Sequence, residues 1–270
     1  MAAKTTISAA VRHAALFPHE DLPDPPPGHP YRLIRRPSYA VGIFPGGTFG
    51  TVAVSAVRPD ELDAVLEDTR SVLAGEGAGR AVWFVPDASP PGLLEALLAR
   101  GVMPSAEPPF EPYVTAMALV SAPDPSPPGV EARLARSFEE FAAGHRIADD
   151  AFEMSEADRK VFEARSRALW EFELDDGAYR TFVALIDGEV VAFAAAIAGE
   201  NMTYLSGGGT RPDRRGRGAY RALVRARWDA SAERGTPALA VGAGAMSGPI
   251  LERLGFEPVG RIDCLVDKFE

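Results

Sequence analysis

One arginine- and glycine-rich turn constrains the fold of this chain more than any other feature. Residues 210–220, with the sequence TRPDRRGRGAY, lie between an extended segment at 202–206 and a helix-like run at 219–234. Glycine lets a backbone approach a ligand closely, and the first turn of a helix has free N–H donors and a positive dipole end. An extended segment, a glycine-rich turn and a helix in this order predict a cradle for phosphate or pyrophosphate.

The charges around this turn indicate a specific anion. Seven arginines fall between Arg211 and Arg227, and Asp213 is the only acid before Asp229, although the whole chain has a net charge of -10. No Gly-Lys-Ser/Thr follows the glycines, so the turn is not a Walker loop, and their spacing does not fit the Gly-x-Gly-x-x-Gly of a dinucleotide fold. The alternative is a solvated loop that is rich in arginine and glycine.

Composition narrows the class of protein. With 270 residues, 46% of them hydrophobic, the chain can form one large domain or two of ordinary size. It has no run of 18 apolar residues and its first residues make a poor secretory signal, so we expect no membrane partner. Cys264 is the only cysteine, which excludes a disulfide scaffold and fits a cytoplasmic protein, and its apolar surroundings predict a buried side chain. The acidic balance disfavours nucleic acid as a partner.

A proline-rich segment divides the chain. Residues 121–129 contain four prolines, which favours an extended linker, and we predict two domains, 1–125 and 126–270. The pattern of the second domain predicts a strand at 130–134, helices at 138–150 and 155–173, strands at 179–186, 190–197 and 201–206, the turn with its helix, a strand at 238–241, a short helix at 249–254 and a last strand at 259–267.

Two segments of this second domain carry a family resemblance. Arg215-Gly-Arg-Gly-Ala-Tyr220 resembles the acyl-CoA signature of GNAT N-acetyltransferases, although Tyr220 departs from the small residue that usually ends it. Leu251-Glu-Arg-Leu-Gly-Phe256 resembles the second signature of the family. The resemblance implies the GNAT acyl-CoA N-acyltransferase fold, of the α/β (α+β) class, with a mixed, mostly antiparallel sheet flanked by helices.

The same resemblance implies acetyl-CoA as the co-substrate. In the family, the strand before the turn splays from its neighbour and pairs with the pantetheine arm, while backbone N–H groups of the turn bind the pyrophosphate. Arg214 would add charge. The residues implied to bind acetyl-CoA are Gly208, Gly209, Thr210, Arg215, Gly216, Arg217, Gly218, Ala219 and Tyr220. The run of glycines at 207–209 also fits a β-bulge.

The first domain repeats part of the sequence pattern of the second domain, but less clearly. Residues 82–85, 89–97 and 101–102 parallel 239–241, 247–254 and 255–256, and a strand at 115–120 would match the final strand. A helix is expected at 60–74, but no arginine–glycine turn precedes it. The first domain therefore resembles a second, smaller and degenerate GNAT-like domain without a cofactor site; the alternative is an unrelated α/β cap. Residues 1–30 should wrap the surface irregularly after one short helix.

The residues that perform the chemistry are poorly specified. Where the family often has a catalytic tyrosine and glutamate, this chain has Leu251 and Met202. Replacement candidates are Tyr204 and Ser206 on the strand before the turn, and Ser247, which could instead only cap its helix. Five acids could meet a cationic acceptor or be ordinary surface charge: Asp149, Asp150, Glu153, Glu171 and Glu173. The histidines show no metal spacing, so no metal is expected.

These observations favour an acetyl-CoA-dependent N-acetyltransferase that acts directly on a primary amine of a small molecule or a protein N-terminus. A non-catalytic acyl-CoA-binding regulatory module is the alternative, because the usual acid and base are missing. An aminoacyl transferase that uses aminoacyl-tRNA is disfavoured by the acidic balance. The sequence assigns no oligomeric state.

Overall fold

The computed structural model describes residues 5–44, 47–106 and 110–269. Its strands form one 12-stranded sheet in the order β1-β2-β3-β4-β12-β6-β11-β10-β9-β8-β7, with β5 paired to β12. The strands are β1 (Arg32–Arg35), β2 (Tyr39–Ile43), β3 (Gly50–Val54), β4 (Arg80–Pro86), β5 (Met103–Pro104), β6 (Tyr113–Leu119), β7 (Glu131–Leu134), β8 (Tyr179–Ile186), β9 (Glu189–Ala198), β10 (Thr203–Thr210), β11 (Leu239–Ala243) and β12 (Glu257–Lys268).

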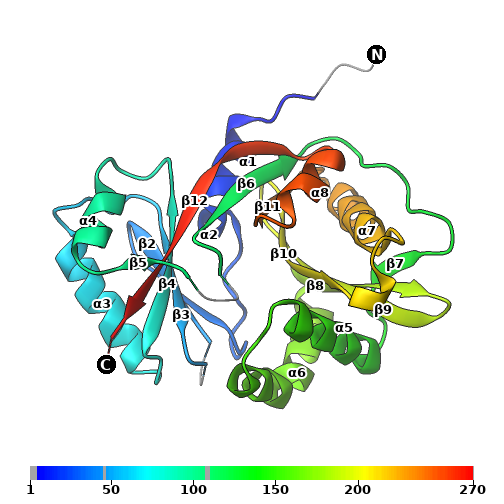
Figure 1. Ribbon diagram of the computed structural model, residues 1–270, viewed down its shortest axis with the longest axis horizontal. Coiled ribbons are helices and arrows are strands. Elements are labelled where there is room, and N and C mark those ends of the chain that lie inside the picture. Colours follow the sequence, from blue (N-terminus) through cyan, green and yellow to red (C-terminus); the bar gives the residue numbers. More distant parts are fainter. Residues whose placement is uncertain (1–4, 45–46, 107–109, 270) are drawn as a thin grey trace.

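Helices cover the sheet in two lobes (Figure 1). We call β1–β5 with α3 and α4 the first lobe, and β7–β11 with α5–α8 the second lobe. The helices are α1 (Ala9–Leu16), α2 (Pro18–Asp21), α3 (Leu62–Ala74), α4 (Leu93–Ala99), α5 (Phe138–Ala151), α6 (Glu156–Asp176), α7 (Ala219–Glu233) and α8 (Gly248–Arg253), with a 3-10 turn at Pro212–Arg214. No helix in the described ranges is long and apolar enough to cross a membrane.

The second lobe follows its expected order of elements. Serine side chains cap its first two helices: Ser137 Oγ accepts from the N–H of Glu140 at 3.3 Å, and Ser155 Oγ accepts from that of Asp158 at 3.1 Å. The predicted boundaries differ from the observed ones by up to four residues, and the largest difference is at the end of one strand. β10 does not end at Ser206 but continues through the glycines to Thr210, because β9 keeps pairing with it on the other side of a bulge.

The two lobes exchange strands at the centre of the sheet. β6 lies between β11 and β12, so it does not close the first lobe as expected. β12 pairs with β6 through its first half and with β4 through its second half, and it runs from one lobe to the other (Figure 1). The physical reason is that β6 has two apolar faces: Met117 and Leu119 pack under α7 and α8, while Ala116 and Ala118 face α1. Such a strand needs neighbours on both edges and cover on both faces.

The first lobe repeats part of the topology of the second. In each, antiparallel strands lead to a parallel pair joined by a helix: β3, α3 and β4 in the first, β10, α7 and β11 in the second. The parallel pair of the first lobe is closed over its whole length, from Gly50–Ala81 to Ala53–Phe84. That the first lobe is a degenerate GNAT-like domain, and that 125/126 divides two domains, remain predictions.

The N-terminal segment does more than wrap the surface. Residues 1–4 lie outside the described part, and the expected short helix is α1, which buries Val11, Ala14 and Leu16 against β6, β11 and β12. α2 follows it, and the buried carboxylate of Asp21 accepts from the N–H and side-chain amide of Asn201 at 3.0 and 2.6 Å. This contact holds the segment against the turn between β9 and β10.

Candidate functional site

The two parallel strands of the second lobe separate where a ligand can enter between them. Within the described chain, β10 and β11 are paired at two positions, the second of which is Tyr204–Ala240. Beyond Tyr204, β10 stays paired with β9 through a bulge between Ser206 and Gly209, while β11 stays paired with β6. One edge of β10 is therefore free to form hydrogen bonds with an extended ligand, as a strand edge can with an added strand.

The turn after β10 has the geometry of an anion cradle. Gly216 and Gly218 have φ angles of 75° and 84°, which residues with side chains rarely adopt. Gly218 precedes α7, whose first residue is Ala219. In the described part of the chain, no backbone–backbone hydrogen bond has an N–H group of residues 216–221 as its donor. These groups, at the positive end of a helix, can bind a pyrophosphate.

The arginines of the turn are not equivalent. Arg214 faces the site, but its Nη2 lies 3.0 Å from Glu189, which compensates its charge. The side chain of Arg217 is 47% exposed and its ion pair with an acid is long, at 4.0 Å. Arg221 has a buried Nε without a hydrogen-bond partner among the described residues. Arg215 also lines the cavity and forms no ion pair within the described chain. Arg215, Arg217 and Arg221 are therefore well placed to meet phosphate, and the last of these was missed in the sequence.

A small residue is usual at the position of Tyr220. The tyrosine ring fits there in this protein because a glycine of β10 lies opposite it. A Cβ atom at Gly208 would lie only 3.2 Å from the Tyr220 ring. The Tyr220 hydroxyl interacts electrostatically with Arg227, which is 1% exposed and donates to the carbonyl of Ala195 at 3.2 Å. Burial lowers the pKa of Arg227 to about 10, so it stays charged at neutral pH. Since Ala195 faces Ser206 at the bulge, this arginine supports β10 where its pairing is interrupted.

The strand edge and the turn open on one cavity of about 1480 Å³. The predicted cofactor-binding residues all line it. Its cationic residues come from the turn, α7 and α8: Arg214, Arg215, Arg217, Arg221, Arg227 and Arg253. Its acidic residues come from elsewhere: Glu111 precedes β6, and Glu153 lies between α5 and α6. The cationic and the acidic residues of the cavity therefore come from different elements of the fold.

All three candidate catalytic residues, Tyr204, Ser206 and Ser247, line this cavity. Tyr204 occupies the last paired position before the strands separate. Burial raises the pKa of its hydroxyl, and a hydrogen bond with the backbone of Gly242 opposes part of that shift. Ser247 stands before α8, but its side chain does not cap the helix; its hydroxyl donates to the carbonyl of Gly244 at 3.4 Å. The hydroxyl of Tyr204 is thus better placed than that of Ser247 to donate a proton. Tyr204 remains protonated at neutral pH.

Of the five acids considered near α6, one reaches the cavity. Asp150 is 2.7 Å from Arg159, and both oxygens of Glu173 accept hydrogen bonds from Thr181. Burial raises the pKa of Glu173 to about 7. Glu153 lines the cavity, in a backbone conformation with φ of 51°. The other acid of the site, Glu111, was missed because it lies far from both signatures in the sequence.

Cys264 is buried, as expected, and its chemistry is unfavourable for covalent catalysis. It is 1% exposed, and burial raises the pKa of its thiol to about 12. At pH 8 roughly one thiol in ten thousand would be ionised, given that value.

We therefore expect iodoacetamide to leave the native protein unmodified at pH 8 for an hour, because the reactive thiolate is rare and covered. Intact-protein mass spectrometry measures the adduct, and the same treatment in guanidinium chloride is the positive control. Rapid alkylation of the native chain would contradict the buried, protonated thiol.

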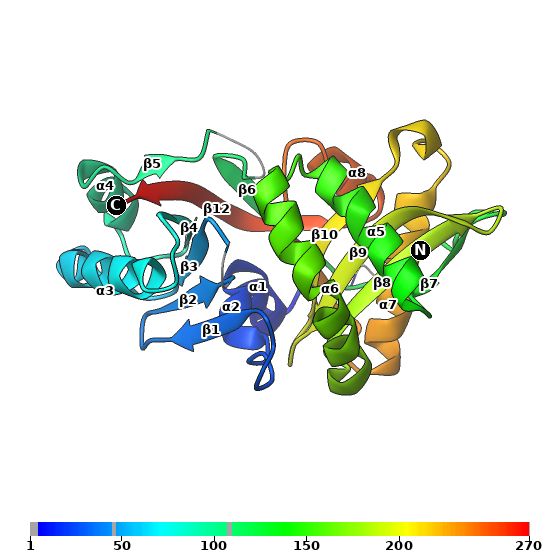
Figure 2. The same ribbon diagram turned by 90° about the horizontal axis from the view of Figure 1, so that it is seen from below.

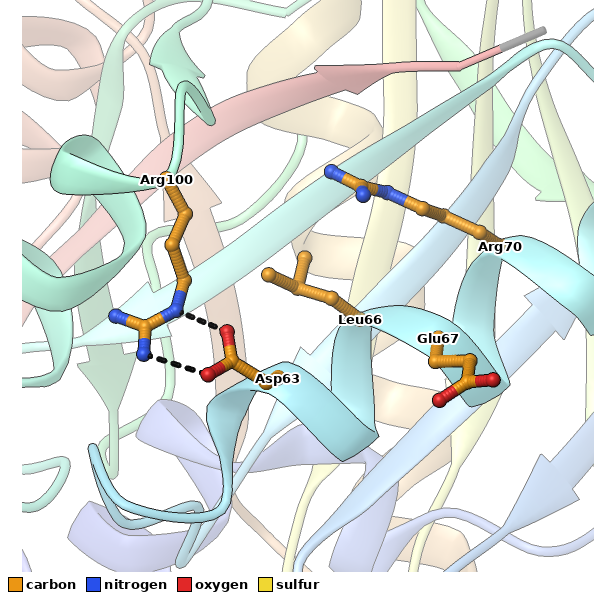
Figure 3. Close-up of a pocket in the computed structure, with 5 residues that line it drawn as sticks. All are labelled: Asp63, Leu66, Glu67, Arg70 and Arg100. Atoms are coloured by element: carbon orange, nitrogen blue, oxygen red, sulfur yellow. Dashed lines mark hydrogen bonds and ion pairs between the residues drawn. The ribbon is translucent and has the colours of Figure 1, made fainter.

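A second hollow, of about 430 Å³, lies on the first lobe between α3 and the end of α4 (Figure 3). Both arginines that line it are paired: Arg100 Nη2 lies 3.1 Å from Asp63, and Arg70 Nε lies 2.8 Å from the buried carboxylate of Asp267. These pairs join α3 to α4 and to β12, so the hollow has a structural explanation and is not a strong candidate for an anion site.

Comparisons with known proteins agree with this geometry. Residues 126–247 match the family model described as Acetyltransferase (GNAT) domain. A GCN5-related N-acetyltransferase from Kribbella flavida has 22% identity and a TM-score of 0.66, with 97% of this chain and 96% of that chain covered. A tandem GNAT protein from the clavulanic acid biosynthesis pathway has 14% identity and a TM-score of 0.59, with 98% and 89% covered. No curated protein sequence matches the chain.

A third solved structure, a GCN5-related N-acetyltransferase from Sphaerobacter thermophilus, has 16% identity and a TM-score of 0.57, with 86% and 80% of the two chains covered. At these identities the likeness concerns the fold, and the expected GNAT fold, with its mixed sheet flanked by helices, is confirmed. The domain match supports an acyltransferase that takes its acyl group from acyl-CoA.

Proposed function

We propose that this protein transfers an acetyl group from acetyl-CoA directly to a primary amine of a small molecule or a peptide N-terminus. The observation that carries the proposal is the separation of β10 from β11 beside a turn whose N–H groups lack backbone partners within the described chain. The separation fits the extended pantetheine arm and the turn fits the pyrophosphate. The glycines of β10 lie between the point of strand separation and the turn, and they also line the cavity.

The proposed reaction needs an acid for the leaving group. The amine nitrogen attacks the thioester carbonyl, the carbon–sulfur bond breaks, and the amine loses one proton to solvent. The thiolate takes a proton from the hydroxyl of Tyr204, which is protonated at neutral pH, and solvent then reprotonates Tyr204. Ser247 stays near its present partner and supports the loop before α8. Met202 and Leu251 are fully buried and take no part.

A regulatory module that binds acyl-CoA without turning it over is the second candidate. It is favoured by the buried Met202 and Leu251, at positions where the family often has an acid and a base. The two candidates share the acetyl-CoA site and differ in whether an amine causes release of free thiol.

Thiol release therefore tests the proposal. Acetyl-CoA with a panel of primary amines should release thiol faster than acetyl-CoA alone, and the rate should rise with pH as the acceptor loses its proton. Tyr204→Phe should lower kcat about 10²-fold with an unchanged Kd for acetyl-CoA, because the ring is kept and only the proton donor is lost. Ser247→Ala, the matched hydroxyl removal in the same cavity, should lower kcat less than about 3-fold.

Tight binding of acetyl-CoA without thiol release for any amine would favour the regulatory module. Equal turnover by the Tyr204→Phe protein would show that this ring only packs.

A further inference from the structure

Besides the proposed acetyl-CoA site, the cavity has an aromatic lining. Phe84, on β4 of the first lobe, and Phe110, before β6, line the cavity with ring centroids 5.9 Å apart at 68°. Phe152, after α5, lines it from the second lobe: a Cβ atom at Gly207 would lie 3.7 Å from its ring. Each of these three rings is only partly buried, so apolar surface faces the cavity.

The base of this aromatic region lies beside the candidate proton donor. A Cβ atom at Gly242 would meet Val114 Cγ2 at 3.1 Å and the Tyr204 hydroxyl at 3.5 Å. Val114 belongs to the same apolar cluster as Phe84. The aromatic region therefore adjoins the point where β10 and β11 separate, which is where the proposed thioester would lie.

A fixed carboxylate stands at the edge of the same region. Glu111 Oε2 accepts a hydrogen bond from the N–H of Ala245 at 2.8 Å, which orients the carboxylate against the loop between β11 and α8. Its other oxygen, Oε1, makes no hydrogen bond within the described chain. Glu153 is the second acid that lines the cavity, and it follows Phe152. An ammonium group can meet these charges while an attached apolar body meets the rings.

We propose that the acceptor is a small primary amine with an apolar, ring-sized body, of the arylalkylamine class. Its ammonium group is drawn in by Glu111 and Glu153, and its body packs against Phe84, Phe110 and Phe152. This inference rests on the proposed function and names its acceptor. The net charge of -10 also attracts a cationic acceptor towards the protein.

A polycationic acceptor fits this cavity poorly. An aminoglycoside or a polyamine carries several ammonium groups, whereas Glu111 and Glu153 are the acids that line the cavity within the described chain. The remaining ammonium groups would have no carboxylate partner among the described lining residues and would meet the arginines of the turn, at a cost in desolvation and repulsion. Such compounds are therefore the negative members of the test panel.

Calorimetry with the full-length protein, saturated with CoA so that no turnover occurs, tests the inference without relying on catalysis. 2-Phenylethylamine should bind roughly 30-fold more tightly than ethanolamine, because its ring leaves water. Phe110→Ala should remove most of that difference by deleting one wall. Glu111→Gln should weaken the binding of 2-phenylethylamine about 10-fold, because the negative charge is lost. The binding of acetyl-CoA should stay the same, because the amide oxygen of glutamine can still accept from the N–H of Ala245. Glu67→Gln, on the first lobe outside this cavity, is the matched charge control.

The same panel is then compared by thiol release from acetyl-CoA, where kcat/KM should follow the order of binding. If putrescine, an aminoglycoside or ethanolamine binds better than 2-phenylethylamine, the inference about the acceptor is wrong while acetyl transfer can still stand. If 2-phenylethylamine does not bind the CoA complex, the inference is also wrong. If it binds but no amine causes thiol release, the aromatic site is supported and the proposed function fails.

Discussion

Replacing Arg217 and Arg221 together by glutamate should weaken acetyl-CoA binding by at least ~10²-fold. The half-exposed Arg217 and the buried, unpartnered Nε of Arg221 lie on the turn and the first helical turn of α7, next to N–H groups without backbone partners in the described chain. Each substitution replaces attraction for the pyrophosphate by repulsion. Isothermal calorimetry measures the loss, and circular dichroism checks the fold.

Arg136→Glu makes one such charge reversal, half of that in the double variant, on an exposed side chain outside the cavity, so its acetyl-CoA binding should match that of the unchanged protein. The structure favours this pair over a change at Gly218. There a side chain would be strained by the φ angle of 84° and would lie 2.6 Å from Pro127. Unchanged affinity in the double variant, with an unchanged circular dichroism spectrum, would show that the turn is not the acetyl-CoA site.

Cutting the chain between the lobes should leave one intact particle, whereas the second part alone should not fold. A protease site inserted after Asp124 lies in an exposed stretch of the linker. After cleavage the two pieces should elute together from a sizing column. They should separate only in denaturant, because β6 lies between β11 and β12 and because β12 pairs with β4.

A fragment of residues 128–270 produced alone lacks β6. It would expose long edges of β11 and β12 and the apolar surface that Met117 and Leu119 cover, so we expect aggregation. The cut full-length protein controls for the new chain ends. A well-dispersed fragment with full thiol release, or pieces that part without denaturant, would show that the exchanged strands are dispensable.

The structure of the linker between the lobes was predicted only in part from the sequence. Its prolines correctly indicate a segment without helix or strand, and residues 120–130 have none. The tertiary structure adds two anchors: Arg225 donates to the carbonyl of Pro123 at 2.9 Å, and Pro127 packs against Gly218. Sequence alone could not show that this segment crosses the cradle, because both contacts join residues that are about a hundred positions apart.

Four strands of the first lobe, β1, β2, β3 and the two-residue β5, were not predicted, although β2 had a signal. Tyr39–Ile43 forms β2 and is buried at every position, and an apolar run of this length is compatible with a buried strand. β1 and β3 are short, with mixed exposure, and they become strands because β2 lies between them. Pairing, rather than local preference, decides such segments.

The sequence by itself determined the turn at 210–220, the helix after it and most elements of the second lobe. These features depend on local chemistry: glycines that permit positive φ, serine caps, and the periodic burial of apolar residues. Only the tertiary structure decided which strands are neighbours at the centre of the sheet. It also decided that Phe84, Phe110 and Glu111 meet Tyr204 in one cavity. Hydrogen bonds between strands and contacts across a cavity join residues far apart in the chain, and no local pattern records them.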